Sequence, residues 1–206
     1  SLAEMPELVR QNVHHMLARS PCIKLRWLGD SDCQAYIRQH FDAELAQIFE
    51  TESRGSFRGD ICRACVLSRE GGFYLDLDVE LNVALPSLVD EHTTFVSAFT
   101  EDNAILNAVM GTAPNSPVML KAVEEIRMWY TGKASHVDKY TSDGWMGPIT
   151  LLRALRAVVD SHCAGHSLQV EGTLQWSCGP QVFRLYHERP LDCSSVSEEC
   201  PQRCTE

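Results

Sequence analysis

The sequence lacks long hydrophobic runs, repeats and any excess of positive charge. No apolar stretch approaches the about 18 to 20 residues of a membrane-spanning helix, so we expect no membrane span in this chain. Its 18 Lys and Arg against 28 Asp and Glu give a formal net charge of −10. Bulk binding to nucleic acid or to an anionic membrane needs a basic surface, and the charge therefore argues against both.

The remaining composition is that of a globular protein, with 44% hydrophobic and 22% charged residues over a length of 206. A chain of this length can bury a sizeable core. We expect one α/β domain over residues 1–190, followed by a polar, Cys-rich tail over 191–206. Because the chain starts at Ser1 rather than Met, we also expect upstream residues, such as a targeting segment, an anchor or part of the fold.

Cysteine is abundant, with nine residues in the chain. The last quarter holds Cys163, Cys178, Cys193, Cys200 and Cys204. This clustering favours disulfides in an oxidising compartment, and the alternative is a set of buried thiols in a cytosolic protein. Cys62 and Cys65 form a C-x-x-C inside a helical pattern, where core packing is favoured over zinc or redox chemistry.

The hydrophobic periodicity predicts alternating helices and strands. Helices are expected at residues 6–20, 30–41, 58–70, 115–132 and 146–161. Strands are expected at residues 22–28, 73–81, 93–99, 104–111, 167–172 and 181–187. Strands that alternate with helices predict an α/β sandwich with a largely parallel or mixed sheet.

The stretch GGFYLDLDVE places two aspartates in an apolar, β-prone segment. Side chains alternate across a strand, so Asp76 and Asp78 should share one face near the carboxyl end of the strand. A buried pair of like charges needs a cation or a proton. Two carboxylates without a nearby His or Cys favour Mg²⁺ or Mn²⁺, with water or phosphate completing the shell. The alternative is an edge strand with a solvated acidic face.

The preceding helix carries Asp60 and Arg63, which are three residues apart and therefore share a face. Such a pair is usually a surface salt bridge worth less than about 1 kcal/mol. Here it lies on a helix that leads directly into the acidic strand. This position favours a clamp for sugar hydroxyls.

The segment from Asp60 to Asp78, D-I-C-R-A-C-V-L-S-R-E-G-G-F-Y-L-D-L-D, resembles the signature of glycosyltransferases with a sugar-binding DXD motif. That family includes yeast-type α-mannosyltransferases, vertebrate-type α-galactosyl- and α-N-acetylglucosaminyltransferases and the large clostridial glucosylating toxins. The similarity continues in N-A-V-M-G-T-A-P-N-S-P, from Asn107 to Pro117, and in W-M-G-P-I-T, from Trp145 to Thr150.

The resemblance implies a GT-A-like (Rossmann-like) fold, a divalent cation (Mn²⁺ or Mg²⁺) and retaining transfer of a sugar from a UDP- or GDP-sugar to a glycan, lipid or protein. It implies that Asp78 binds the metal directly, and that Asp76 binds it directly or through water and touches the ribose. Donor-site roles fall on Asp60, Arg63, Gly72, Tyr74 and Asn107. Trp145 is either an acceptor platform or a core aromatic, and His187 is a candidate further metal ligand or an ordinary strand-end residue.

The sequence departs from the family at two points. Nothing before Met5 matches the first strand that helps seat the nucleoside base, and Met146 replaces the Thr of a common Thr-Gly-Pro. A non-catalytic relative that binds a sugar-nucleotide or glycan is therefore one alternative. A phosphatase of the haloacid-dehalogenase type is another, although Glu80 stands where that class has Thr or Val. Cysteine density and family habit predict the secretory lumen or Golgi, with the cytoplasm as the alternative.

Overall fold

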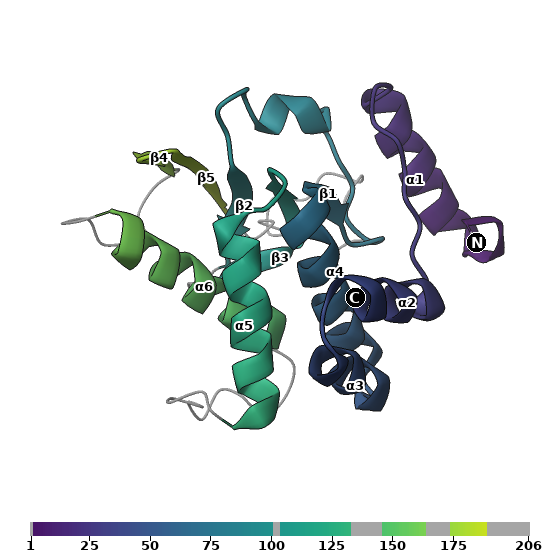
Figure 1. Cartoon of the computed structure of the whole chain (residues 1–206). Coiled ribbons are helices and arrows are strands. Elements are labelled where there is room, and N and C mark those ends of the chain that lie inside the picture. The colour runs from purple at the N-terminus through teal and green to yellow at the C-terminus, as the bar shows by residue number, and fades with distance from the viewer. Residues whose placement is uncertain (1, 101–103, 133–145, 164–173, 189–206) are drawn as a thin grey trace, which may run out of the picture.

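The computed structural model describes residues 2–100, 104–132, 146–163 and 174–188. Within them, helices flank one five-stranded mixed sheet (Figure 1). The α-helices are α1 (Glu7–Arg19), α2 (Asp30–His40), α3 (Ala43–Thr51), α4 (Gly55–Glu70), α5 (Pro117–Thr131) and α6 (Met146–His162). The 3₁₀ helices are η1 (Leu2–Glu4) and η2 (Leu85–Leu88). The strands are β1 (Gly72–Leu75), β2 (Phe95–Phe99), β3 (Ile105–Thr112), β4 (Leu174–Cys178) and β5 (Gln181–His187).

The strand order in the sheet is β1-β3-β2-β5-β4. β3 is antiparallel to both β1 and β2, and β2 is parallel to β5. The strands β1, β2 and β5 therefore run in one direction, and their carboxyl ends lie at the same edge of the sheet. This arrangement confirms the predicted mixed sheet. No strand precedes β1 within residues 2–71.

A double glycine joins α4 to β1 without an intervening loop. Gly71 ends the helix with φ of +68°, and a Cβ there would lie 2.6 Å from the backbone nitrogen of Pro114. Only glycine fits this left-handed position against a neighbouring backbone. The short connection keeps the side chains of α4 close to the carboxyl end of β1.

Helices α4, α5 and α6 pack together, and both α4 and α6 contact β3. The core side chains are large and apolar; Phe57, Ile61, Phe95, Phe99, Ile105 and Phe183 are at most 1% exposed. Ser116 caps α5 by accepting a hydrogen bond from the backbone of Met119, and Gly132 ends the helix in the left-handed conformation. Helix α1 lies to one side of this body, next to the loop that follows β1 (Figure 1). None of the described helices is long and apolar enough to cross a membrane.

Two strand predictions were wrong or incomplete, and two elements were not predicted. The segment 22–28 has the alternating pattern of a strand but pairs with no neighbour in the described chain, and Leu25 is exposed. The strand predicted over 73–81 stops at Leu75, because the chain turns there and the N–H of Val79 donates to the carbonyl of Asp76. Helix α3, capped by Asp42, was not predicted. The strand predicted over 167–172 lies outside the described residues, whereas β4 was missed.

Candidate functional site

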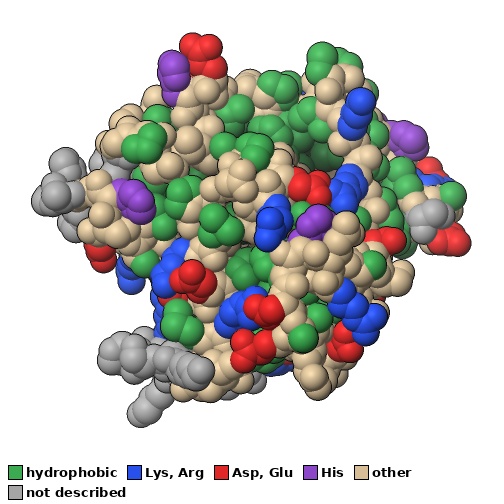
Figure 2. All heavy atoms as spheres, viewed as in Figure 1, with side chains coloured by type: hydrophobic (Ala, Val, Ile, Leu, Met, Phe, Trp, Pro, Cys, Tyr) green, Lys and Arg blue, Asp and Glu red, His purple; other side chains and the backbone are tan. Residues whose placement is uncertain are grey.

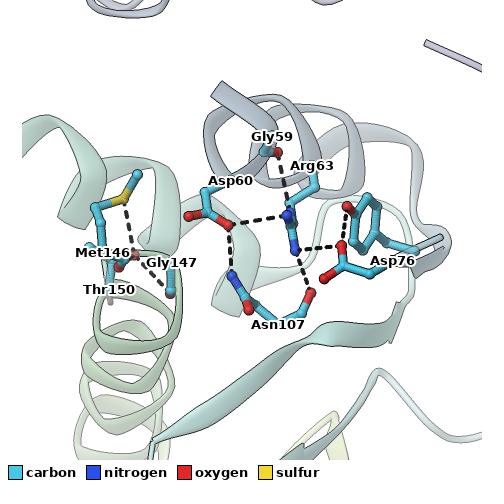
Figure 3. Close-up of polar contacts among 9 residues, drawn as sticks. Gly59, Asp60, Arg63, Asp76, Asn107, Met146, Gly147 and Thr150 are labelled. Carbon is cyan, nitrogen blue, oxygen red and sulfur yellow. Dashed lines mark hydrogen bonds and ion pairs between the residues drawn. The ribbon is translucent and has the colours of Figure 1, made fainter. Parts of the chain in front are cut away.

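A buried guanidinium connects helix α4 with strands β1 and β3 (Figure 3). Arg63 projects from α4, and its side chain is only 9% exposed. Its Nε donates to the carbonyl of Gly59 at 3.3 Å, and its Nη1 donates to the carbonyl of Asn107 at 2.7 Å. The same group forms ion pairs with Asp60 at 3.3 Å and Asp76 at 3.4 Å. Arg63 therefore holds two carboxylates and a strand backbone in one arrangement.

Asp60 lies beside Arg63 (Figure 3) and is 6% exposed. Its Oδ1 accepts a hydrogen bond from Asn107 Nδ2 at 2.7 Å. Burial raises the pKa of this carboxyl to about 6, and the charge of Asp76 acts in the same direction, while Arg63 and the backbone N–H of Gly147 oppose the shift. Stabilisation of a carboxylate by an N–H in the first turn of α6 is the usual behaviour of a helix N-terminus.

Gly147 allows the first turn of α6 to approach this cluster. A Cβ at Gly147 would lie 2.2 Å from Asn107 Nδ2 and 2.5 Å from Asp60 Cγ. No side chain fits in that space. The sequence analysis treated this glycine only as part of a Met-Gly-Pro variant and did not place it at the site.

Tyr74 and Asp76 form the part of the site at the end of β1. The Tyr74 hydroxyl donates to Asp76 Oδ1 at 2.6 Å, and the Arg63 guanidinium carbon lies 4.2 Å from the centre of the Tyr74 ring. Burial and the Asp76 carboxylate raise the pKa of Tyr74, so the phenol stays protonated and remains a donor. Oδ1 of Asp76 is thus engaged by Tyr74 and Arg63. Its second oxygen remains for a ligand.

Asp78 lies in the turn that follows β1 and is exposed. Within the described residues it has no hydrogen-bond or ion-pair partner. The prediction that Asp76 and Asp78 share one face of a buried strand is therefore wrong, because β1 ends at Leu75. The pair is not a buried like-charge pair, so burial by itself does not require a cation.

The donor set of these two residues still fits a hard divalent cation. Asp76 offers one carboxylate oxygen that is not engaged by Tyr74 or Arg63, and the exposed Asp78 offers both of its oxygens. Mg²⁺ commonly takes one or two protein carboxylates and completes its shell with water and substrate phosphates. No group of three His, Cys, Asp or Glu side chains that could hold a metal occurs among the described residues.

The other predicted site residues do not join this cluster in the described structure. Gly72 begins β1, at the opposite end of the strand from Asp76. His187 ends β5, with its ring 5.4 Å from that of Phe99. Three strand spacings, roughly 14 Å, separate β5 from β1, so the sheet does not bring His187 to the aspartates. Trp145 lies outside the described residues.

A small cavity extends from the polar cluster toward the helices. Its lining includes Asp60, Arg63 and Asn107, together with apolar side chains such as Met119 and Ile126 of α5. Its volume is about 20 Å³, which is room for about one water. Ligand pockets usually measure about 300 to 1,000 Å³. The described residues alone therefore do not enclose a sugar ring.

Residues 8–95 match the family described as "Glycosyltransferase sugar-binding region containing DXD motif". This segment is therefore similar to the sugar-binding region of the DXD glycosyltransferases. The matched segment runs from α1 to the first residue of β2 and contains the DXD aspartates, Asp76 and Asp78, together with Asp60, Arg63 and Tyr74. It spans somewhat less than half of the chain.

The fold of the chain is similar to that of a solved "PaToxG Glycosyltransferase". The TM-score is 0.53 and the sequence identity 14%, over 78% of this chain and 67% of the other. At this identity the likeness concerns the fold alone. No curated protein sequence matches the chain significantly.

Proposed function

We propose that this chain is a metal-dependent glycosyltransferase that moves a sugar, with retention of configuration, from a nucleotide-sugar to a glycan, lipid or protein acceptor. The observation that carries the proposal is the position of Arg63, which contacts both Asp60 and the first aspartate of the DXD motif. A group that binds sugar hydroxyls and a group that binds a cation are thereby held next to each other. Such a site suits a substrate that joins a sugar to a diphosphate.

The two aspartates would have different tasks. Asp76, whose Oδ1 is fixed by Tyr74 and Arg63, would offer its second oxygen to the cation, and the exposed Asp78 would supply the other protein ligand. A bound Mn²⁺ or Mg²⁺ supplies positive charge that neutralises a diphosphate leaving group. Arg63 orients Asp76 through the ion pair with its Oδ1.

Asp60, Arg63 and Asn107 would orient the sugar. Their hydrogen bonds to one another already fix the side chains, so little conformational entropy is lost when a substrate hydroxyl binds. The carboxylate of Asp60 can accept hydrogen bonds from a substrate. Burial raises the pKa of this carboxyl to about 6. No side chain of this cluster has the surroundings of an activated nucleophile. This suits attack by the acceptor itself from the face of the leaving group.

The proposal is tested by metal-dependent turnover of a panel of UDP- and GDP-sugars, measured as release of nucleoside diphosphate with and without Mn²⁺. Asp78→Asn should abolish Mn²⁺-dependent donor binding and leave the fold intact, because an exposed carboxylate without partners contributes little to stability. Asp160→Asn is the matched control. Asp160 is also exposed, and it lies in the last turns of α6, about 20 Å along the helix from Gly147. Normal donor binding by Asp78→Asn would refute the metal role.

A non-catalytic relative that binds a sugar-nucleotide is the second candidate. The DXD motif does not separate it from the enzyme, because nucleotide binding and catalysis would use the same cation and the same two aspartates. Mn²⁺-dependent nucleotide binding without any turnover across the panel would decide for this alternative. The phosphatase hypothesis is disfavoured because β1 is an edge strand antiparallel to its neighbour; release of phosphate from simple monoesters would restore it.

We further propose that the protein works in an oxidising compartment such as the secretory lumen. Cys33 and Cys62 form a disulfide between α2 and α4, and Cys163 is also disulfide-bonded. Disulfides persist in such compartments and are rare in the cytosol. A count of free thiols in protein isolated from its own cells tests this. Reduced Cys33 and Cys62 would point to the cytoplasm instead.

A further inference from the structure

Helix α1 contacts the turn that carries Asp78 through one side chain. Asn12 Nδ2 donates to the carbonyl of Leu77 at 3.0 Å and to the carbonyl of Val79 at 2.7 Å. These two carbonyls belong to the residues on either side of Asp78. One amide group therefore binds the backbone both before and after the second aspartate of the motif.

Other contacts along the same face of α1 hold the rest of this loop. Arg19 Nη1 donates to the carbonyl of Asn82, and the backbone N–H of Leu85 donates to Ser20 Oγ at 3.0 Å. Asn12 and Arg19 are seven residues apart, which places them on the same side of the helix. In Figure 1 the loop after β1 extends toward α1, and Figure 2 shows a hollow lined by hydrophobic side chains in this region of the surface.

The orientation of the Asn12 amide is set by its two partners. Both are carbonyl oxygens, so only the NH₂ end of the amide can face them. As a consequence, Oδ1 of Asn12 is buried and has no hydrogen-bond partner. A buried acceptor without a partner is unfavourable. The two hydrogen bonds to the motif turn must outweigh that cost.

We propose that Asn12 is a positioning residue, which fixes the turn of the DXD motif and thereby the carboxylate of Asp78. Asp78 has no partner of its own in the described chain, so nothing else in its side-chain surroundings sets its position. The backbone on each side of it is held by Asn12 instead. The consequence for the cation rests on the proposed function, whereas the effect on the turn does not.

The test uses Asn12→Leu and Asn12→Asp in the full chain. Both variants are close in size to Asn, and both remove the donors; the Asp variant also places an acceptor against two carbonyls. Gln11→Leu is the matched control, because Gln11 is the preceding residue of α1, is exposed, and donates its side-chain hydrogen bond to the exposed Glu7 rather than to the turn. Two quantities are measured: the exchange rate of the Val79 amide by NMR in metal-free protein, and the affinity for Mn²⁺ alone.

The Val79 amide is a local reporter because it donates to the carbonyl of Asp76 within the turn. Loss of two hydrogen bonds should accelerate its exchange about tenfold in both Asn12 variants, and should weaken Mn²⁺ binding by about as much. Gln11→Leu should change neither. Unchanged Val79 exchange would overturn the proposal. Faster exchange with unaltered Mn²⁺ affinity would also overturn it, since Asn12 would then be structural only.

The experiment also separates a failure of the proposed transferase function from a failure of the proposed role of Asn12. If the unaltered protein binds no Mn²⁺ and turns over no nucleotide-sugar, the metal-dependent transferase is refuted. The exchange of the Val79 amide still decides whether Asn12 fixes the turn. A fall in melting temperature in all three variants alike would indicate damage to α1 itself and would count against a specific role for Asn12.

Discussion

Arg63 and Asp76 lie 3.4 Å apart, Nη1 to Oδ1, although a double-glycine connection separates the helix of one from the strand of the other. The contact links the pair on α4 to the acidic motif after β1. It also occupies one oxygen of Asp76, which determines how that residue can meet a cation. A substitution of Arg63 should therefore affect both Asp60, the proposed sugar-orienting residue, and Asp76, the proposed cation ligand.

Arg63→Ala is expected to destabilise the protein by about 3 to 5 kcal/mol, because it leaves the buried Asp60 without its cationic partner. In variant protein that still folds, binding of nucleotide-sugar should fall more than binding of free nucleoside diphosphate. Urea denaturation and calorimetric titration measure the two effects. Arg38→Ala is the control, since Arg38 pairs with Glu50 at the surface and should cost less than about 1 kcal/mol. Equal loss for both ligands would contradict the sugar-orienting role.

Gly147→Ala should be destabilising even though alanine is the better helix former. The added Cβ would lie 2.2 Å from Asn107 Nδ2, and overpacking of this kind costs about 1 to 3 kcal/mol, which exceeds the gain of up to about 1 kcal/mol in helix propensity. Gly55→Ala in α4 is the control, because nothing lies within 4 Å of a Cβ there. Thermal unfolding of the two variants checks the contrast. A Gly147→Ala protein as stable as the original would show that α6 can move away from Asp60.

The sequence predicted the parts of the site that depend on local spacing. Asp60 and Arg63 pair across one helical turn, and the double glycine directs that helix into β1 next to Tyr74 and Asp76. The mixed sheet followed from the alternation of helices and strands. The resemblance supplied Asn107, whose side chain does bind Asp60.

Features that depend on long-range contacts could not be predicted in this way. The alternating apolar pattern continues to Val79, but the strand needs a partner, and the last backbone contact of β1 with β3 is the N–H of Asp76 donating to the carbonyl of Ala108. Asn12 is 65 residues from Leu77, and no local pattern relates the two. Gly147 reaches the site only because α6 packs against β3. The placement of Asp78 in an exposed turn followed from these contacts rather than from the motif.

The disulfide between Cys33 and Cys62 joins α2 to α4, the helix that carries Asp60 and Arg63, across a sequence separation of 29 residues. Removing a link that closes a loop of this size should cost about 3 kcal/mol. The double variant Cys33→Ala, Cys62→Ala is preferred to chemical reduction, because Cys163 is disulfide-bonded as well. Cys22→Ala is the control, since Cys22 is an exposed free thiol. If the urea midpoint of the double variant equals that of the Cys22→Ala control, the disulfide does not stabilise the fold.

The pH dependence of stability should carry a contribution from Glu52, the buried residue that follows α3. Hydrogen bonds from Arg54 and Tyr130 lower the pKa of its carboxyl from 4.5 to about 2, although burial opposes the shift. A carboxyl whose pKa is lower in the folded protein stabilises it above the unfolded pKa, and the benefit disappears as the pH falls from 4.5 toward 2. Arg54 is half exposed and its charge is partly screened, so we expect a loss of about 1 to 2 kcal/mol.

Denaturation midpoints measured between pH 6 and pH 2.5, at roughly unit intervals, would follow this loss. Glu52→Gln should be less stable at pH 6 and should show a flatter profile at acid pH, because the carboxylate that loses its partners on protonation is gone. Glu50→Gln should keep the original slope, since Glu50 pairs with Arg38 at the surface. Acid profiles of equal slope for Glu52→Gln and the unaltered protein would mean that other carboxylates govern the acid transition. The network of Glu52, Arg54 and Tyr130 would then contribute packing rather than charge stabilisation between α3 and α5.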